Sequence, residues 1–157
     1  MKIPALFFIS LFLTFTAWSQ TVGETGTYGL IPWSLVEEAP AFPQCESTDL
    51  AVLKKCTRKR IGIVVSQNFN PEIVSDLGYE GKFKIRIEFT INKQGEAVKV
   101  QTTSPHAKLK EEAERVVALL PKMKPGKFKD EIVEVHVVMP LVLMVKAKTD
   151  TLKEKQH

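Results

Sequence analysis

The two cysteines, Cys45 and Cys56, are the residues of this 157-residue chain whose chemistry is simplest to judge. Their even number suits a single disulfide bridge, and their spacing is far from the C-x-x-C pattern of redox-active pairs. A continuous helix would hold their Cα atoms about 16 Å apart, from a rise of 1.5 Å per residue, whereas a disulfide needs them within about 7 Å. Either the chain turns back between them, or a helix begins late, or both thiols stay reduced.

No arrangement of side chains in the sequence indicates an enzyme. His106 follows a proline, His136 stands between two valines, and His157 is the last residue. None lies near an acid–nucleophile pair, and H-E-x-x-H, G-x-S-x-G, P-loop and dinucleotide-binding glycine patterns do not occur. Three His and two Cys are too few to predict a four-ligand zinc site. We therefore expect neither catalysis nor a metal, a cofactor or a small-molecule substrate.

The N-terminal segment has the three-part build of a secretory signal. Lys2 precedes an apolar run over 3–17, and Ala17-Trp18-Ser19 places small residues where a signal peptidase reads. We expect a signal peptide over 1–19, cleaved after Ser19; the alternative is an uncleaved membrane anchor, for which the run is shorter than the about 20 residues of a spanning helix. Export to an oxidising compartment favours a Cys45–Cys56 bridge, with a break in the helix between them.

Charge and composition limit the classes of partner and divide the chain. Lys and Arg number 22 against 18 Asp and Glu, a formal net charge of +4 with the two signs interspersed. Such a weak and mixed excess does not indicate nucleic-acid binding. Residues 20–43 hold glycines and prolines without periodicity and predict an irregular arm, 44–145 predict one folded domain, and 146–157 predict a polar tail.

Two helix-start signals and one strongly alternating segment predict the first half of the domain. Ser47-Thr48-Asp49 begins a helix with a basic cluster over 54–60. We interpret this cluster as a solvated face, and the alternative is a binding patch. Asn70-Pro71 begins a short second helix that Gly78 ends. From Phe83 to Ile91 apolar and polar residues alternate, which predicts a half-buried strand. The turn over 92–95 returns the chain into a second strand.

The second half of the domain adds a helix and a long strand. Apolar residues at helical spacing from Leu109 to Leu120 predict an amphipathic helix. A last strand is predicted from about Glu131 to Met144, and Pro140 places it at a sheet edge or a bend. The order helix, helix, strand, strand, helix, strand predicts an α+β fold of two layers, with an antiparallel three-stranded sheet and helices on one face.

These segments together carry a resemblance to a known family. The run from Asn70 to Phe89, with a Gly-x-x-Gly step over 78–81, resembles the C-terminal domain of TonB-type energy transducers. The turn over 92–95, the helix over 109–117 and the Pro-Gly segment over 122–127 are similar to that family's hairpin, helix and Pro-Gly loop. The resemblance spans about 41–144, and the Phe-Pro-x-Cys lead-in at 42–45 with Cys56 is similar to Bacteroidetes-type members.

The resemblance implies a non-enzymatic periplasmic module that takes part in TonB-dependent transport. Domains of this kind grip a short extended segment of an outer-membrane receptor or transporter, largely by strand addition. Two groups of residues are the candidate peptide contacts carried over to this chain: Asn68, Phe69, Asn70 and Pro71, and Val133, Val135 and Val137 of the last strand.

Two alternatives to a secreted peptide-binding module remain open. An exposed edge strand is a template for pairing with a second copy, which would make the protein a self-associating envelope component or homodimer. If the N-terminal segment is not cleaved, the chain would instead be an inner-membrane-anchored short energy transducer, with a spacer over 20–40 that reaches at most about 70 Å at 3.3 Å per residue.

Overall fold

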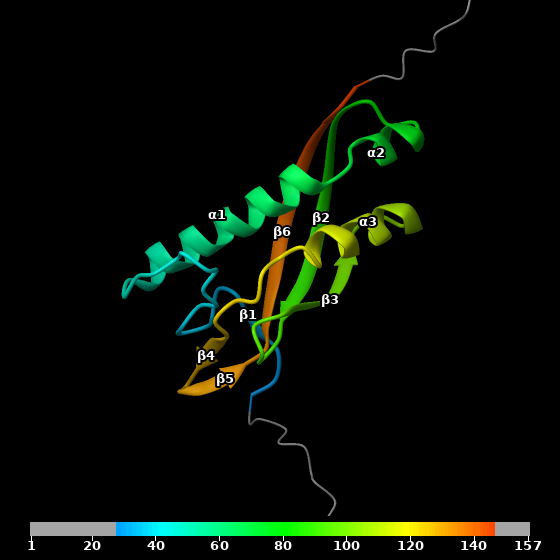
Figure 1. The fold of residues 1–157 in the computed structure, drawn as a ribbon. Helices are drawn as coiled ribbons and strands as arrows, with labels where there is room; N and C mark the ends of the chain where they lie inside the picture. Colours follow the sequence, from blue (N-terminus) through cyan, green and yellow to red (C-terminus); the bar gives the residue numbers. More distant parts are fainter. Residues whose placement is uncertain (1–27, 147–157) are drawn as a thin grey trace, which may run out of the picture.

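The computed structural model describes residues 28–146 of the chain (Figure 1). The predicted signal peptide over 1–19 and its cleavage, residues 20–27 of the predicted arm and 147–157 of the predicted tail lie outside these residues. The described residues form the elements β1, α1, α2, β2, β3, α3, β4, β5 and β6 in chain order. No helix among residues 28–146 is long and apolar enough to cross a membrane.

Helix α1 (Leu50–Asn68) begins at the predicted start signal. The Asp49 carboxylate accepts the backbone N–H groups of Ala51 and Val52, at 2.7 and 3.1 Å, and so satisfies two of the unpaired donors of the first turn. Helix α2 (Glu72–Asp76) follows Pro71 and is closed by Gly78 at φ +83°. Helix α3 (Ala107–Val117) buries the apolar face that its periodicity predicts.

The main sheet has four strands in the order β1-β6-β2-β3. β2 (Gly81–Ile91), β3 (Ala97–Thr102) and β6 (Val135–Val145) are antiparallel neighbours, as predicted, and β6 pairs with β2 along its whole length. β1 (Ile31–Pro32) pairs in parallel with Val135 and His136. A second sheet of two strands joins β4 (Gly126–Phe128) to β5 (Glu131–Val133).

The predicted three-stranded, wholly antiparallel sheet is therefore wrong in strand number and in direction. β1 has two residues, too few to show any alternation, and it lies in the segment predicted to be irregular. The strand predicted from about Glu131 is two strands, because the chain changes sheets between Val133 and Val135. The α+β class and the order of the longer elements are confirmed.

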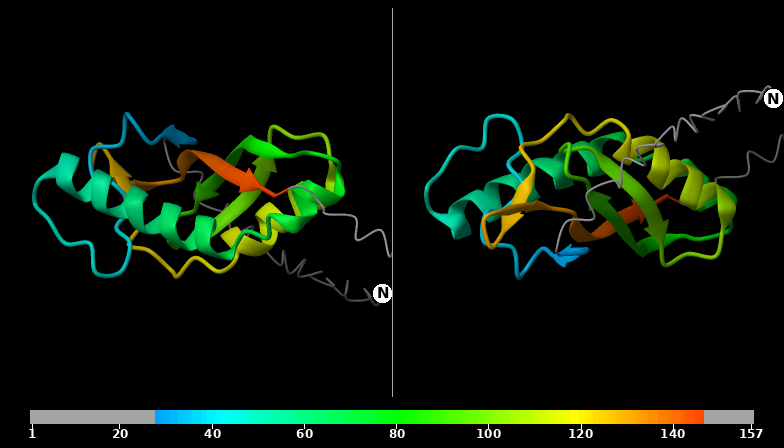
Figure 2. Two further views of the ribbon diagram at one scale, coloured as in Figure 1. Left: turned by 90° about the horizontal axis from the view of Figure 1, so that it is seen from above. Right: turned by 90° about the horizontal axis from the view of Figure 1, so that it is seen from below.

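Helices α1 and α3 lie on the same side of the main sheet (Figure 2). The odd-numbered residues of β6 face them and are buried, from Val135 at 0% to Leu143 at 8% exposed. The even-numbered residues face the other side, where Val142 and Met144 are 50% and 73% exposed. The sheet thus buries one face against the helices and leaves much of the other in contact with solvent.

Candidate functional site: the outer edge of β6

A disulfide joins Cys45 to Cys56 and fastens the N-terminal arm to α1. The two Cα atoms are 5.8 Å apart. This is possible because α1 begins at Leu50, after Cys45, so the late-beginning helix is the correct one of the three alternatives. The expected break in the helix is wrong, because α1 runs without interruption from Leu50 to Asn68. The bond is supported by a second tether, in which the backbone N–H of Phe42 donates to the buried hydroxyl of Thr57, at 3.1 Å. The arm is therefore fixed along the side of the domain on which β1 lies.

β1 covers the first part of the outer edge of β6. The backbone N–H of Ile31 donates to the carbonyl of Glu134, at 2.8 Å, and that of Trp33 donates to the carbonyl of His136, at 3.0 Å. Trp33 and Val36, which follow β1, are 9% and 1% exposed, so the segment is anchored by apolar burial as well as by hydrogen bonds. We call Val135–His136 the covered half of the edge.

Beyond His136 the outer edge of β6 has no neighbouring strand among the described residues. Main-chain groups in a strand point alternately to its two sides. Because the His136 carbonyl bonds to β1, the N–H and C=O groups of Val138, Val142 and Met144 and the C=O of Pro140 point to the same outer side. Pro140 lies opposite Arg86 in the ladder, and the main chain of Arg86 bonds instead to Thr103 on the far side of β2. We call Val138–Val145 the open half.

One side chain reaches the open half. Nη2 of Arg58, in α1, donates to the carbonyl oxygen of Val138, at 2.6 Å. No other hydrogen bond within residues 28–146 reaches the outer main-chain groups from Val138 to Met144. The free groups are the N–H of Val138, Val142 and Met144 and the carbonyls of Pro140, Val142 and Met144. They form a short, regular row of donors and acceptors.

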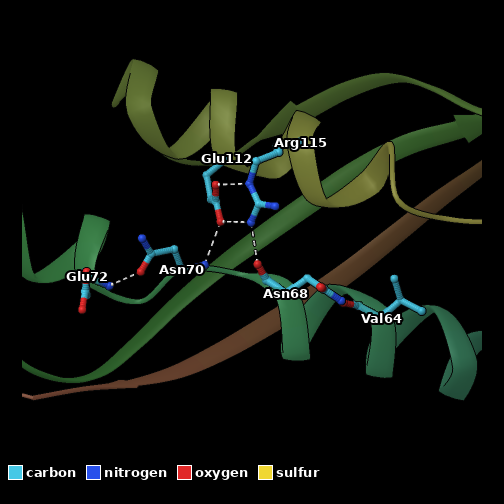
Figure 3. Close-up of polar contacts among 6 residues, drawn as sticks. All are labelled: Val64, Asn68, Asn70, Glu72, Glu112 and Arg115. Carbon is cyan, nitrogen blue, oxygen red and sulfur yellow. Dashed lines mark hydrogen bonds and ion pairs between the residues drawn. The ribbon is translucent and has the colours of Figure 1, made fainter.

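The segment over 68–71, which we call the connector, links α1 to α2 and is held by an ion pair on α3 (Figure 3). The backbone N–H of Asn70 donates to Oε1 of Glu112, at 2.7 Å. Arg115 donates to both carboxylate oxygens of Glu112, at 2.7 and 2.8 Å, and to the carbonyl of Asn68, at 2.6 Å. Phe69 is 4% exposed. The connector is therefore fixed in place by main-chain hydrogen bonds.

Glu112 is the buried acid of this network, with 6% of the residue exposed. Its hydrogen bonds from the Arg115 side chain, and to a lesser extent from the Asn70 N–H, stabilise the charged form, and they lower the pKa of the Glu112 carboxyl despite its burial. The sequence places Glu112 and Arg115 three residues apart on α3, a spacing that brings their side chains together. Their contact with the connector, 42 residues away, cannot be read from that spacing.

The structure separates the two groups of predicted peptide contacts. Pro71 lies beside the end of the open half, where it lines a groove of about 590 Å³ together with α2 and the end of β6: Glu72, Ser75, Asp76, Met144, Val145 and Lys146. Val133, Val135 and Val137 lie at or before the other end of β6, and their side chains are at most 1% exposed. Of the predicted residues, Pro71 is the one that meets the exposed end of the open half.

The sequence analysis did not predict Val142, Met144 and Arg58 as peptide contacts. The alternation of the last strand contained the signal, because Pro140 has no N–H and must point to an unpaired side, and residues two positions away share that side. Arg58 stood in a run of five basic residues over 54–60, and no property of that run distinguishes the one that reaches β6.

Part of the chain matches a known protein family. Residues 67–142 match the model of the family described as Gram-negative bacterial TonB protein C-terminal. No curated protein and no solved structure matches the chain. The matched range begins at the end of α1 and includes the connector, β2, β3, α3 and most of β6. It leaves out β1 and the disulfide.

Proposed function

Since residues 67–142 belong to the family of TonB C-terminal domains, we propose that this protein is a non-enzymatic periplasmic module that binds an extended segment of an outer-membrane receptor or transporter. Domains of the family interact with outer-membrane receptors and act in envelope transport. The observation that carries the proposal for this chain is the open half of β6, a row of unpaired main-chain groups at the edge of a well-packed sheet.

Binding would occur by addition of a strand beside the open half, continuing the sheet outward from β6. The N–H groups of Val142 and Met144 would donate to the incoming segment, and the carbonyls of Pro140, Val142 and Met144 would accept from it. Such main-chain bonds supply affinity with little dependence on sequence. Pro140 offers no donor, so the pairing would be short and centred on Val142. Side chains of the segment would contact Val142 and Met144, and its end would reach the groove beside Pro71.

The predicted contacts take different roles in this proposal. Pro71 would line the end of the binding groove, whereas Asn68, Phe69 and Asn70 would support it through their bonds and packing. Val133, Val135 and Val137 have core-facing side chains. Their contribution would be to hold β5 and β6 in place beneath the edge.

The test compares Val142→Pro with Val142→Ala. Proline at 142 removes the central N–H donor, and Pro140 shows that β6 accepts proline at a position of this parity. The probes are short synthetic peptides that tile the periplasmic N-terminal segments of outer-membrane receptors from the same organism, and binding is measured by fluorescence anisotropy.

We expect a subset of the peptides to bind Val142→Ala slightly more weakly than the wild type, because part of the side-chain contact is lost. The same peptides should bind Val142→Pro at least about tenfold more weakly than Val142→Ala, the effect of losing about 1.4 kcal/mol. Equal binding to Val142→Pro would contradict strand addition at the open half. Light scattering on the same samples tests the predicted homodimer: a stable dimer that no peptide dissociates would show that a second copy occupies the edge.

A further inference from the structure

We infer that Arg58 makes the open half of β6 selective for a segment that carries a carboxylate at the end lying beside Val138. The inference rests on the proposed function, since it assigns a chemical property to the segment that the edge would bind. It concerns a side chain of α1, outside the range that matches the family model.

Arg58 occupies the first acceptor of the open half without having a charged partner of its own. Within residues 28–146 its single hydrogen bond is the 2.6 Å contact with the Val138 carbonyl. A guanidinium carries five N–H donors in a planar fork that matches a carboxylate. None of the Asp and Glu residues within 28–146 forms an ion pair with it. The Arg58 guanidinium is therefore hydrogen-bonded to a neutral carbonyl, although it could form an ion pair with a carboxylate.

A second cation of α1 reaches the segment that follows β1. Lys54 is one helical turn before Arg58 and donates to the carbonyl of Ser34, at 3.2 Å, in the segment that follows β1. Partial burial lowers the pKa of the Lys54 ammonium, and none of the described acidic side chains pairs with it either. Two cations thus stand where the covered half ends and the open half begins, each satisfied by a backbone carbonyl.

The chain beyond Arg58 leaves the edge accessible. Gly62 is the next residue in the row formed by Lys54 and Arg58 at intervals of four. A Cβ at Gly62 would meet one atom within 4 Å, the Sδ of Met139 at 4.0 Å. A strand lying along the open half would therefore pass the Arg58 guanidinium at one end and a helix surface without a side chain further along.

An incoming strand would require an exchange of partners at Val138. The N–H of the segment would take the Val138 carbonyl, and the guanidinium would move from that carbonyl to a carboxylate on the segment. A guanidinium–carboxylate pair, in which both partners are charged, is stronger than the bond from the guanidinium to a neutral carbonyl. A segment without the carboxylate would displace Arg58 into solvent and gain nothing in return. In the free protein the same side chain occupies the Val138 carbonyl, which opposes unwanted pairing at that end of the exposed edge.

The test uses a random peptide library displayed on phage and panned against the full-length protein. We expect selected peptides to show enrichment of Asp or Glu over Asn and Gln at one fixed position. A selected peptide and its counterpart with Glu replaced by Gln are then compared by fluorescence anisotropy. The acidic form should bind the wild type about three- to fivefold more tightly, the range expected for an exposed ion pair, and rising salt should reduce that ratio.

Arg58→Ala should bring the ratio of the two affinities to one, and Arg60→Ala, which removes an exposed arginine from another side of α1, should leave it unchanged. A ratio of one in the wild type, or a ratio that survives Arg58→Ala, would overturn the inference. The two failures are distinguishable: peptides that lose binding in Val142→Pro but ignore charge refute the role of Arg58 alone, and peptides that bind Val142→Pro as they bind the wild type refute strand addition itself.

Discussion

The covered and open halves of the outer edge of β6 are alike in their strand residues and differ in what lies beside them. Both alternate buried and outward residues, and both pair with β2 on their inner side. The covered half meets β1, whose position depends on Trp33, on the tether to Thr57 and on the disulfide. Among residues 28–146, the open half is hydrogen-bonded by one side chain, that of Arg58. What an edge can bind is therefore decided by segments far away in the chain.

Removing the disulfide should give the largest loss of stability, because the bond fastens the arm that contains β1 to α1. Replacing Cys45 and Cys56 together by Ser should lower the free energy of unfolding by about 3 kcal/mol, the loss expected when a short loop is no longer closed in the unfolded chain. Urea denaturation measures this. A reductant should destabilise the wild type by a similar amount and leave the double variant, which has no cysteine, unchanged; a wild type that the reductant does not destabilise would contradict the assignment.

A matched pair of valines tests the two halves directly. Val135→Ala, in the covered half, removes methyl groups from a side chain that is 0% exposed and should cost about 2 kcal/mol. Val142→Ala, in the open half, removes them from a side chain that is 50% exposed and should change stability by less than about 0.5 kcal/mol. Equal losses of unfolding free energy in urea would mean that the side chains of the two halves are equally packed, which would contradict the difference between them.

Glu112→Gln tests whether the Glu112–Arg115 ion pair stabilises the connector. The charged hydrogen bonds to Arg115 and Asn70 would become weaker, so the variant should lose about 1–2 kcal/mol at neutral pH. Glu111→Gln, on the exposed face of α3, is the control and should lose almost nothing.

The Glu112 effect should depend on pH in a defined direction. The folded-state pKa of Glu112 is lowered, so its carboxylate contributes full stability above the ordinary glutamate pKa of about 4.3 and loses it as the pH falls toward the folded-state pKa. The stability difference between the wild type and Glu112→Gln should therefore shrink below about pH 4. A difference that is constant down to that pH would contradict the role of the charge.

The longer elements could be predicted because each shows its period over enough residues. β2, β3 and α3 follow their alternation or helical spacing, and Asp49 and Gly78 mark helix ends by local chemistry. β1, with two residues, has no period to detect, and its parallel pairing depends on a contact between residues about 100 positions apart. Sequence periodicity identifies the two faces of a strand but not which of its sides lacks a neighbour.

The candidate site shows the same division. Pro140 indicated an unpaired side of the last strand, and the open half confirms that part of the prediction. The valines chosen as contacts have odd numbers, and the odd-numbered side chains of this segment point into the core. The outward residues, Val142 and Met144, are equally apolar in sequence. Their exposure follows because residues 28–146 place no second layer on that face.

Amide hydrogen exchange of β6, measured by NMR with and without a selected peptide, tests the central claim most directly. In the free protein the Val142 and Met144 amides, which point outward, should exchange much faster than those of Leu141 and Leu143, which face β2. Bound peptide should protect Val142 and Met144 and leave Leu141 and Leu143 as they were. Protection of Val142 and Met144 in the free monomer, or no change in their exchange when peptide is bound, would contradict strand addition at the open half of β6.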